Sequence, residues 1–313
     1  MEMGSPNLDV FAATLLELAR ADRDVLAVTS DSRGSARLTA YAQAVPAQIV
    51  EVGIAEQNVV GIAAGLASAG KKVFAVSPAC FLTARAFEQI KNDVCYSDQP
   101  VKLVGISAGV SYGALGATHH SLHDYAALRA INNITIVAPA DNFETREAIR
   151  AAYAAPHPVY VRLGKAAVPH VHAEGDTFAL GQAALVREGR DLTYLAAGEA
   201  VPVAIAAAQR LATEGITCRV LSMHTMKPLD EAAVLAAARE TGAIVTVEEH
   251  SVHGGLGEAC AAVLMRHGAH VPFEIVGFPD EFMVYGSQSE LFEHYGISGE
   301  GLADTARRLL AGY

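Results

Sequence analysis

The sequence of 313 residues contains no tryptophan and only four cysteines, Cys80, Cys95, Cys218 and Cys260, with no Cys-x-x-Cys pair among them. Scattered single cysteines are typical of reduced, mostly buried thiols rather than of a disulfide framework. The first residues also lack the basic start and apolar stretch of a secretory signal peptide. We therefore expect a cytoplasmic protein.

Positive charge is also scarce, because 23 Lys and Arg face 34 Asp and Glu and the formal net charge is −11. This balance argues against nucleic acid and against an anionic membrane surface as partners. No apolar run reaches the length of a membrane span without interruption by Gly, Pro or a charge. Hydrophobic residues make up 51% of the chain, which is enough for large cores, and the length suggests two domains.

Short β-rich runs alternate with helical patterns along the whole chain, and most of the runs carry few charges, as buried parallel strands do. The predicted strands are 25–29, 47–50, 72–76, 101–106, 135–138, 159–162, 192–196, 218–221 and 243–247. This alternation predicts an α/β fold of two doubly wound domains. We place a first domain at 1–165, a linker with Pro169, His170, His172 and Gly175 at 166–180, and a smaller second domain at 181–313.

Glu56 is the most informative single residue, because it stands at a strand-to-helix junction between Ile49-Val50 and the apolar run from Val59 to Leu66. A helix this apolar is buried, so we expect a buried carboxyl group whose charged form is disfavoured and whose pKa is raised. With no Lys or Arg nearby in the sequence, such an acid is a candidate to hydrogen-bond a ring nitrogen or to move a proton. The alternative is an ordinary glutamate favoured by the helix dipole.

Phe81 follows the predicted strand 72–76, and ligands of open α/β sheets bind at the carboxyl ends of the strands. An aromatic ring there can stack on a flat heterocycle, although a core phenylalanine at a helix start fits the pattern equally. The segment is therefore a candidate for one wall of a ligand site.

A glycine-rich loop from Gly113 ends in the histidines His119, His120 and His123. His119 and His123 have the i, i+4 spacing of some zinc sites, but no acidic third ligand is evident. We favour a loop histidine that donates a hydrogen bond to a substrate oxygen.

A second glycine-rich turn, Gly254-Gly255-Leu256-Gly257, follows the strand 243–247 and opens a helix. Its shape would suit a phosphate-binding turn. It lacks full dinucleotide spacing and no Lys follows it, so a tight βα turn is the simpler interpretation.

Taken together, these features resemble the C-terminal half of a transketolase, and more closely the smaller subunit of a split, two-polypeptide transketolase. The resemblance runs from Asp31 to the end of the chain. It depends on the motifs Gly-Ile-Ala-Glu-Gln-Asn at 53–58, Arg-Ala-Phe-Glu-Gln-Ile at 85–90, Gly-Ala-Thr-His at 116–119, Ala-Pro-Ala-Asp at 138–141, Glu-Glu-His at 248–250 and Gly-Gly-Leu-Gly at 254–257.

The resemblance implies a pyrimidine-binding domain of a thiamin diphosphate enzyme, followed by a transketolase C-terminal domain. Glu56 would then be the catalytic glutamate that hydrogen-bonds the aminopyrimidine ring, and Phe81 would stack on that ring. Arg85 and Asp31 would lie near the cofactor. His119 would face the substrate as a catalytic and binding residue. Positions that can hold a sugar phosphate fall on Arg162 and Ser35.

The Gly-Asp-Gly and distant Asn of the family's diphosphate and metal motif are absent from this sequence. The resemblance therefore implies that thiamin diphosphate and Mg²⁺ (or Ca²⁺) are held by a partner subunit with the diphosphate-binding domain. We expect an α2β2 heterotetramer that acts on a small-molecule sugar, and no metal ligands in this chain.

Three features depart from the family's pattern: Ala114 and Leu115 replace acids of the loop, Ser107 replaces a histidine, and Leu8 stands near the place of an arginine. Fewer charged contacts in a sugar-phosphate site predict a non-standard substrate, either a less polar, differently phosphorylated or sulfonated sugar, or a specialised acceptor.

Other interpretations stay open on the sequence. The beta subunit of a 2-oxo acid dehydrogenase has the same two domains, and 1-deoxy-D-xylulose-5-phosphate synthase shares them in one long chain. A non-catalytic scaffold subunit and a nucleotide-binding module built on 254–257 are further alternatives.

Overall fold

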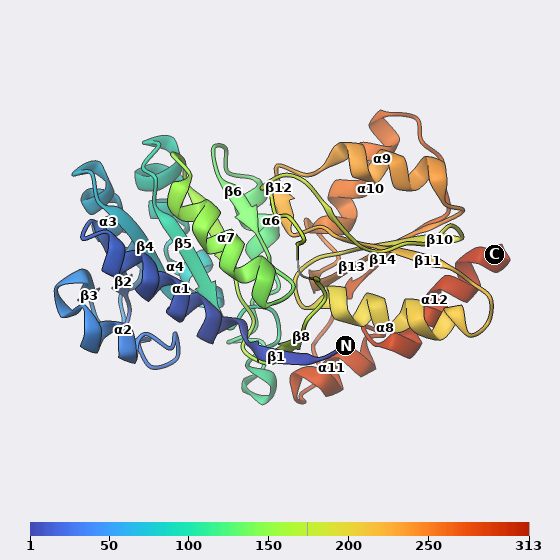
Figure 1. The fold of residues 1–313 in the computed structure, drawn as a ribbon, viewed down its shortest axis with the longest axis horizontal. Helices are drawn as coiled ribbons and strands as arrows, with labels where there is room; N and C mark the ends of the chain where they lie inside the picture. Colours follow the sequence, from blue (N-terminus) through green and yellow to red (C-terminus); the bar gives the residue numbers. More distant parts are fainter. Residues whose placement is uncertain (174, 313) are drawn as a thin grey trace.

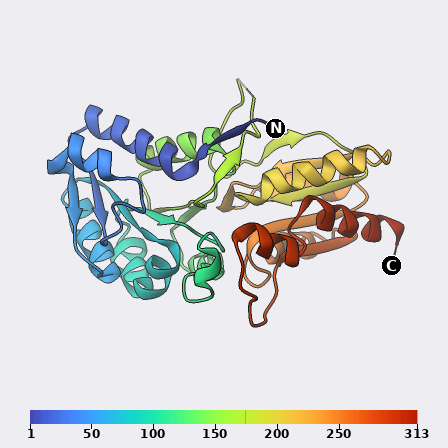
Figure 2. The ribbon, with the colours of Figure 1, turned by 90° about the horizontal axis from the view of Figure 1, so that it is seen from below.

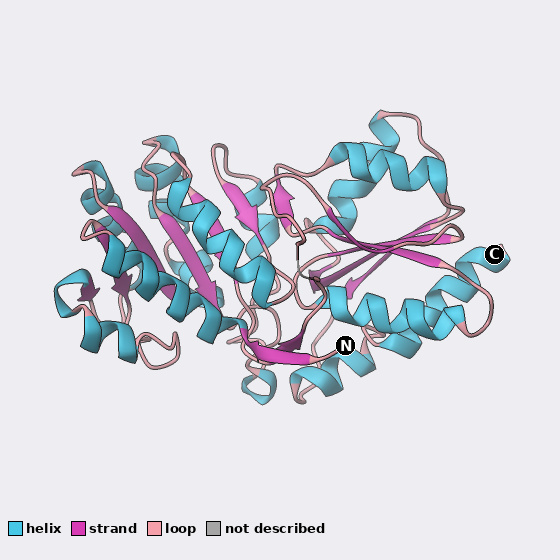
Figure 3. Ribbon diagram, in the orientation of Figure 1, coloured by secondary structure: helices cyan, strands magenta, loops and turns pink. Residues whose placement is uncertain are grey.

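The alternating pattern builds two α/β units side by side, shown in Figures 1 and 3. The computed structural model describes residues 1–173 and 175–312. In chain order, the elements of the first part are β1 (Met3–Pro6), α1 (Asn7–Ala21), β2 (Val25–Thr29), α2 (Thr39–Ala44), η1 (Pro46–Gln48), β3 (Ile49–Glu51), α3 (Glu56–Ser68), β4 (Lys72–Pro78), α4 (Ala79–Arg85), α5 (Phe87–Gln89), the π-helical η2 (Ile90–Tyr96), β5 (Lys102–Ile106), η3 (Gly113–Leu115), α6 (Asp124–Arg129), β6 (Thr135–Val137), α7 (Asn142–Ala154), β7 (Val159–Arg162) and β8 (Ala167–Pro169).

The second part continues the alternation and ends in two helices. Its elements are β9 (Ala184–Arg187), β10 (Leu192–Ala196), α8 (Ala200–Ala212), β11 (Cys218–Ser222), β12 (Thr225–Lys227), α9 (Glu231–Glu240), β13 (Ile244–Ser251), α10 (Leu256–Arg266), β14 (Phe273–Phe278), α11 (Gln288–His294) and α12 (Gly299–Ala311). Among these described helices, none is both long and apolar enough to cross a membrane.

The first sheet has the strand order β12-β6-β7-β5-β4-β2-β3 within the described residues, and its pairs are parallel except for β12 with β6. Alternate side chains of β4 enter different cores: Phe74 and Val76 pack with α1 and α7, whereas Val73 and Ala75 pack with α3. The sheet therefore lies between two helical layers, as Figure 2 shows.

The strand order of this sheet reverses at β2, because β3 lies on one side of it and β4 on the other. The carboxyl ends of β2 and β4 are joined by a hydrogen bond of 2.6 Å between the hydroxyls of Ser30 and Ser77. Open α/β sheets bind ligands at such a reversal point. The segments that follow β2, β3, β4 and β5 carry most of the predicted site residues.

The second sheet has the order β14-β13-β10-β11-β9 in the part of the chain described, with β9 as an antiparallel edge. α8 and α12 cover one face, and α9 and α10 cover the other (Figure 1). The predicted fold class, two doubly wound α/β domains, is confirmed by this arrangement.

Two short strands pair across the predicted domain boundaries. β12, from the range predicted for the second domain, pairs with β6 of the first sheet. β8, from the predicted linker 166–180, pairs with β1 near the N-terminus. Glu174 of that linker and the terminal Tyr313 lie outside the described residues. Backbone groups at sheet edges gain partners in this way, and hydrophobic periodicity does not reveal such short pairings.

Candidate active site

Glu56 is the first residue of α3 and is 4% exposed, so the predicted burial is correct. Its carboxylate is not without a cation, however. Nη1 of Arg85, at the end of α4, donates to both carboxylate oxygens at 3.1 and 3.0 Å. The expectation that no Lys or Arg pairs with Glu56 is therefore wrong. The cation comes from a residue 29 positions further along the chain, on another helix.

Arg85 links this carboxylate to an aromatic row. Its guanidinium carbon lies 4.4 Å from the centre of the Phe81 ring, and the edge of that ring meets His119 at a centroid distance of 5.3 Å. Stacking of a guanidinium on an aromatic face is favourable and fixes its orientation. Glu56, Arg85, Phe81 and His119, four of the predicted site residues, are thus brought together from three separate segments.

A hollow of about 510 Å³ opens beside this row, lined by residues 54–58 and by Arg85. The side chain of Arg85 is 50% exposed, whereas that of Glu56 is almost fully covered. The hollow therefore combines a buried carboxylate with a half-exposed cation. This polarity suits a ligand with a hydrogen-bonding heterocyclic ring.

Tyr112 was not predicted as a site residue, yet its ring also contacts that of His119, at a centroid distance of 5.4 Å. The Nδ1 atom of His119 also lies 2.9 Å from the hydroxyl of Thr118. The imidazole therefore contacts two aromatic rings and has one nitrogen engaged. The position of Tyr112 just before the glycine-rich loop was the available sequence signal.

Asp31 and Ser35 lie in the segment after β2 and both are exposed. Asp31 has a positive φ of 51° and follows Ser30, so it stands at the same edge of the sheet as α4. No contact joins either residue to Glu56 or His119 in the described structure. Their predicted roles stay predictions.

Arg162 lies elsewhere, and its predicted role as a phosphate ligand conflicts with its position. It is 6% exposed, its Nε donates to Asp124 at 2.8 Å, and its Nη2 donates to the carbonyls of Ser121 and Glu249 at 3.0 and 2.8 Å. A guanidinium whose donors are used inside the protein is not available to a substrate. We correct the assignment: Arg162 joins the two domains.

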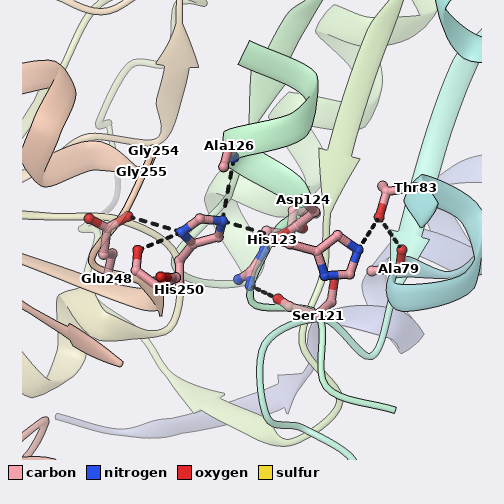
Figure 4. Close-up of polar contacts among 12 residues, drawn as sticks. Ala79, Thr83, Ser121, His123, Asp124, Ala126, Glu248, His250, Gly254 and Gly255 are labelled. Atoms are coloured by element: carbon pink, nitrogen blue, oxygen red, sulfur yellow. Dashed lines mark hydrogen bonds and ion pairs between the residues drawn. The ribbon is translucent and has the colours of Figure 1, made fainter. Parts of the chain in front are cut away.

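Figure 4 shows the polar network around this joint, in which His250 of the second domain lies between Asp124 and Glu248. Burial, opposed in part by the nearby Asp124, lowers the pKa of His250 to about 4. Burial alone would raise the pKa of Asp124, but the charge of Arg162 is the main influence that holds it below its ordinary value. At neutral pH the joint therefore contains a neutral imidazole and an ionised Asp124 paired with Arg162.

The turn at 254–257 is filled by the protein's own carboxylate. Glu248 accepts hydrogen bonds from the backbone N–H groups of Leu256 and Gly257 at 2.7 and 2.9 Å, at the start of α10. A Cβ atom on Gly255 would overlap this carboxylate. The anion position of the turn is thus occupied from within, and the alternative of a nucleotide-binding module is wrong.

His123 makes no metal cluster with His119. Its Nε2 atom lies 3.3 Å from the hydroxyl of Thr83 on α4, as Figure 4 shows. Nowhere in residues 1–173 or 175–312 do three His, Cys, Asp or Glu side chains gather as they would around a metal ion. The zinc alternative therefore has no third ligand in the described structure.

Comparison with known proteins places this chain in a family. The pyrimidine-binding domain of transketolase matches residues 7–171, and the transketolase C-terminal domain matches residues 181–302. The chain is 52% identical over 297 residues to one of the subunits of the apulose-4-phosphate transketolase of Phocaeicola vulgatus, with 95% of each chain covered. It is 38% identical over 301 residues to a subunit of the 6-deoxy-6-sulfo-D-fructose transketolase of a Clostridium species, with 96% and 93% covered.

A solved structure described as a split gene transketolase in an inactive beta4 tetramer has the same fold, with a TM-score of 0.88 and 35% identity over 98% of this chain and 99% of that one. The sequence resemblance drawn from the motifs around Glu56 and His119 is therefore confirmed. The chain belongs to the transketolase family, as a pyrimidine-binding domain followed by a transketolase C-terminal domain.

Proposed function

We propose that this chain is the smaller subunit of a two-component, thiamin diphosphate-dependent transketolase that moves a two-carbon ketol unit between sugars. The observation that carries the proposal is the buried carboxylate of Glu56, at the start of α3, within one row that also holds Phe81 and His119. The names of the relatives, both transketolase subunits, support the same reaction.

The residues present fit the pyrimidine end of thiamin diphosphate. A carboxylate oxygen of Glu56 would hold a hydrogen bond to a ring nitrogen, using lone pairs that Arg85 leaves free. Phe81 would present an aromatic face to the ring, and Arg85 and Asp31 would complete the surroundings. When bound, the cofactor would supply the electron sink for cleavage and formation of the carbon–carbon bond.

His119 would act on the substrate side. Its ring is held by Phe81 and Tyr112, so an imidazole nitrogen can donate to or accept from a substrate hydroxyl without reorienting. Ser35 is proposed as a contact of the substrate's anionic group, a role for which Arg162 is not available. We also propose the domain limits 1–165 for the first domain, 166–180 for the linker and 181–313 for the second domain.

A second polypeptide is required by this proposal, because this sequence lacks the Gly-Asp-Gly motif for the diphosphate and its metal. We infer that the partner carries Mg²⁺ (or Ca²⁺) and that two copies of each subunit form a heterotetramer. A cytoplasmic location stays a prediction.

For the substrate we propose a sugar with a phosphate or sulfonate in an unusual position. By the resemblance to the family, Ala114 and Leu115 stand where acids are usual and Ser107 where a histidine is usual, so the segment that carries His119 would offer fewer polar groups to a substrate. The names of two relatives, which refer to apulose 4-phosphate and to 6-deoxy-6-sulfo-D-fructose, point to the same class of substrate.

The test combines this chain with the product of a neighbouring gene that carries Gly-Asp-Gly, together with thiamin diphosphate and Mg²⁺. Isotope-labelled ketose donors should transfer two labelled carbons to an aldose acceptor. Glu56→Gln should reduce kcat by roughly 10²–10⁴-fold, since it keeps the shape but removes the proton-holding carboxylate.

The alternatives give different results. Decarboxylation of a 2-oxo acid with acyl transfer to a lipoyl group would indicate a dehydrogenase subunit. Full activity of the Glu56→Gln complex would indicate a scaffold. Efficient use of xylulose 5-phosphate with ribose 5-phosphate would refute the unusual substrate but not the reaction.

A further inference from the structure

The loop 107–123, which carries His119, touches the second domain at three of its glycines. Gly109, Gly113 and Gly116 all have positive φ angles, of 61°, 52° and 74°. A Cβ atom on Gly109 would overlap the carboxylate of Glu249, and one on Gly113 would lie 3.1 Å from the carbonyl oxygen of Gly286. One on Gly116 would lie 2.6 Å from the ring of Tyr285. Because these three glycines have no side chain, the second domain can pack closely against the loop.

The base of the loop is fixed by Glu249, which is 2% exposed and belongs to β13. Its Oε1 accepts hydrogen bonds from the backbone N–H of Val110 at 2.9 Å and from Nε2 of Gln288 at 2.8 Å. Gln288 is the first residue of α11 and also donates to Glu199 at 3.1 Å. The carboxylate of Glu249 is thus fixed by Gln288 of its own domain, and it accepts a hydrogen bond from the backbone of the first domain.

The two ends of the loop meet at the same place. The N–H of Ser121 donates to the carbonyl of Gly109 at 2.8 Å. Arg162 then donates to the carbonyls of both Ser121 and Glu249. The two ends of the loop are hydrogen-bonded to each other at this point. The position of His119 at the loop tip therefore depends on the hydrogen bond between Glu249 and the backbone of Val110.

We propose that Glu249 is a positioning residue of the C-terminal domain, which holds the base of the loop 107–123 so that His119 faces the substrate. The role of His119 rests on the proposed function, whereas the hold on the loop does not. Tyr285, which is 79% exposed, is a second support at Gly116. The C-terminal domain thereby shapes the substrate side of a site whose main residues belong to the first domain.

The first test measures hydrogen–deuterium exchange of peptides spanning 107–123 in the isolated chain. In Glu249→Leu the Val110 amide loses its acceptor, so exchange of the loop should accelerate by about tenfold. Glu249→Gln keeps an acceptor oxygen and should stay near the wild type. Tyr285→Ala removes an exposed ring, so it should fold and loosen the part of the loop around Gly116.

Glu248→Gln is the matched control, because Glu248 is equally buried in the same strand but bonds to the start of α10. It should change exchange at Leu256 and Gly257 and leave the loop unaffected. Unchanged loop exchange in both Glu249→Leu and Tyr285→Ala would overturn the proposal. Equal loosening of the loop in Glu248→Gln would overturn it as well.

The second test uses the complex with the partner subunit. Glu249→Leu or Tyr285→Ala should raise the KM for the sugar by roughly fivefold to a hundredfold, with cofactor affinity unchanged. Glu249→Gln should restore the wild-type KM. An equal loss of cofactor affinity would indicate a general structural defect and overturn the positioning role. A wild-type complex without transketolase activity would refute the proposed function, while the exchange experiment would still test the hold on the loop.

Discussion

Glu56 and Arg85 form an ion pair between a buried carboxylate and a half-exposed guanidinium. One nitrogen of the guanidinium donates to both carboxylate oxygens. The arginine lines the hollow and its guanidinium stacks on Phe81. A ligand that enters therefore meets a carboxylate and a cation that are already oriented by each other and by the Phe81 ring. Such preorganisation lowers the cost of binding.

Loss of this cation should destabilise the fold. In Arg85→Leu the carboxylate of Glu56 is left buried without its donor, and we expect the free energy of unfolding to fall by about 1–3 kcal/mol. Chemical denaturation of the isolated chain measures this change. Arg85→Lys keeps the charge but not the planar stacking, so it should show a smaller loss. Equal stability of wild type and Arg85→Leu would mean that the pair contributes nothing.

The aromatic face of Phe81 should matter for the cofactor more than for the fold. Phe81→Leu removes the ring, and an aromatic contact is worth about 0.5–1.5 kcal/mol, so cofactor binding should weaken roughly threefold to tenfold. Titration of thiamin diphosphate into the reconstituted complex measures this affinity. Phe87→Leu, a partly buried phenylalanine in α5, is the control and should leave the affinity unchanged. An unaltered affinity in Phe81→Leu would contradict the proposed contact.

Arg162 should be required for stability rather than for phosphate binding. Arg162→Met leaves Asp124 buried and unpaired, which costs about 3–5 kcal/mol in the free energy of unfolding. The double variant Asp124→Asn with Arg162→Met should recover part of this loss. If Arg162→Met instead kept its stability and raised only the KM for the anionic sugar, our correction of its role would be wrong.

Glu199, which shares the Gln288 amide with Glu249, should make the protein less stable as the pH rises from 4.5 to about 8. Burial first, and then the neighbouring Glu249, raise the pKa of Glu199 from 4.5 to about 8. The folded state therefore binds the proton more tightly than the unfolded state, so stability that is complete below pH 4.5 is lost as the pH rises through about 8.

Glu199→Gln is neutral at every pH and should not show this loss. The Tm of the wild type should fall relative to that of the variant as the pH rises from 4.5 to about 8. Glu188→Gln, at an exposed carboxylate, is the control and should run parallel to the wild type. Parallel curves for Glu199→Gln would contradict the raised pKa.

Local chemistry was predictable where it depended on neighbours in the sequence. The cap of α7 by Asp141, whose side chain accepts from the N–H of Glu144, follows from residue types a few positions apart. The burial of Glu56 follows in the same way from the apolar run behind it. Arg162 could not be placed, because a strand-end arginine has the same local pattern whether it faces a substrate or Asp124.

The sequence by itself determined the alternation of strands and helices, the fold class and the motifs that mark the transketolase family, because these depend on periodicity and on residues close together in the chain. Only the tertiary structure decided which charges meet: Arg85 with Glu56, Arg162 with Asp124, and Glu249 with the loop of His119. Whether a buried charge is paired or free depends on distances of a few ångströms between segments far apart in the sequence, and Coulomb and hydrogen-bond energies change steeply over that range.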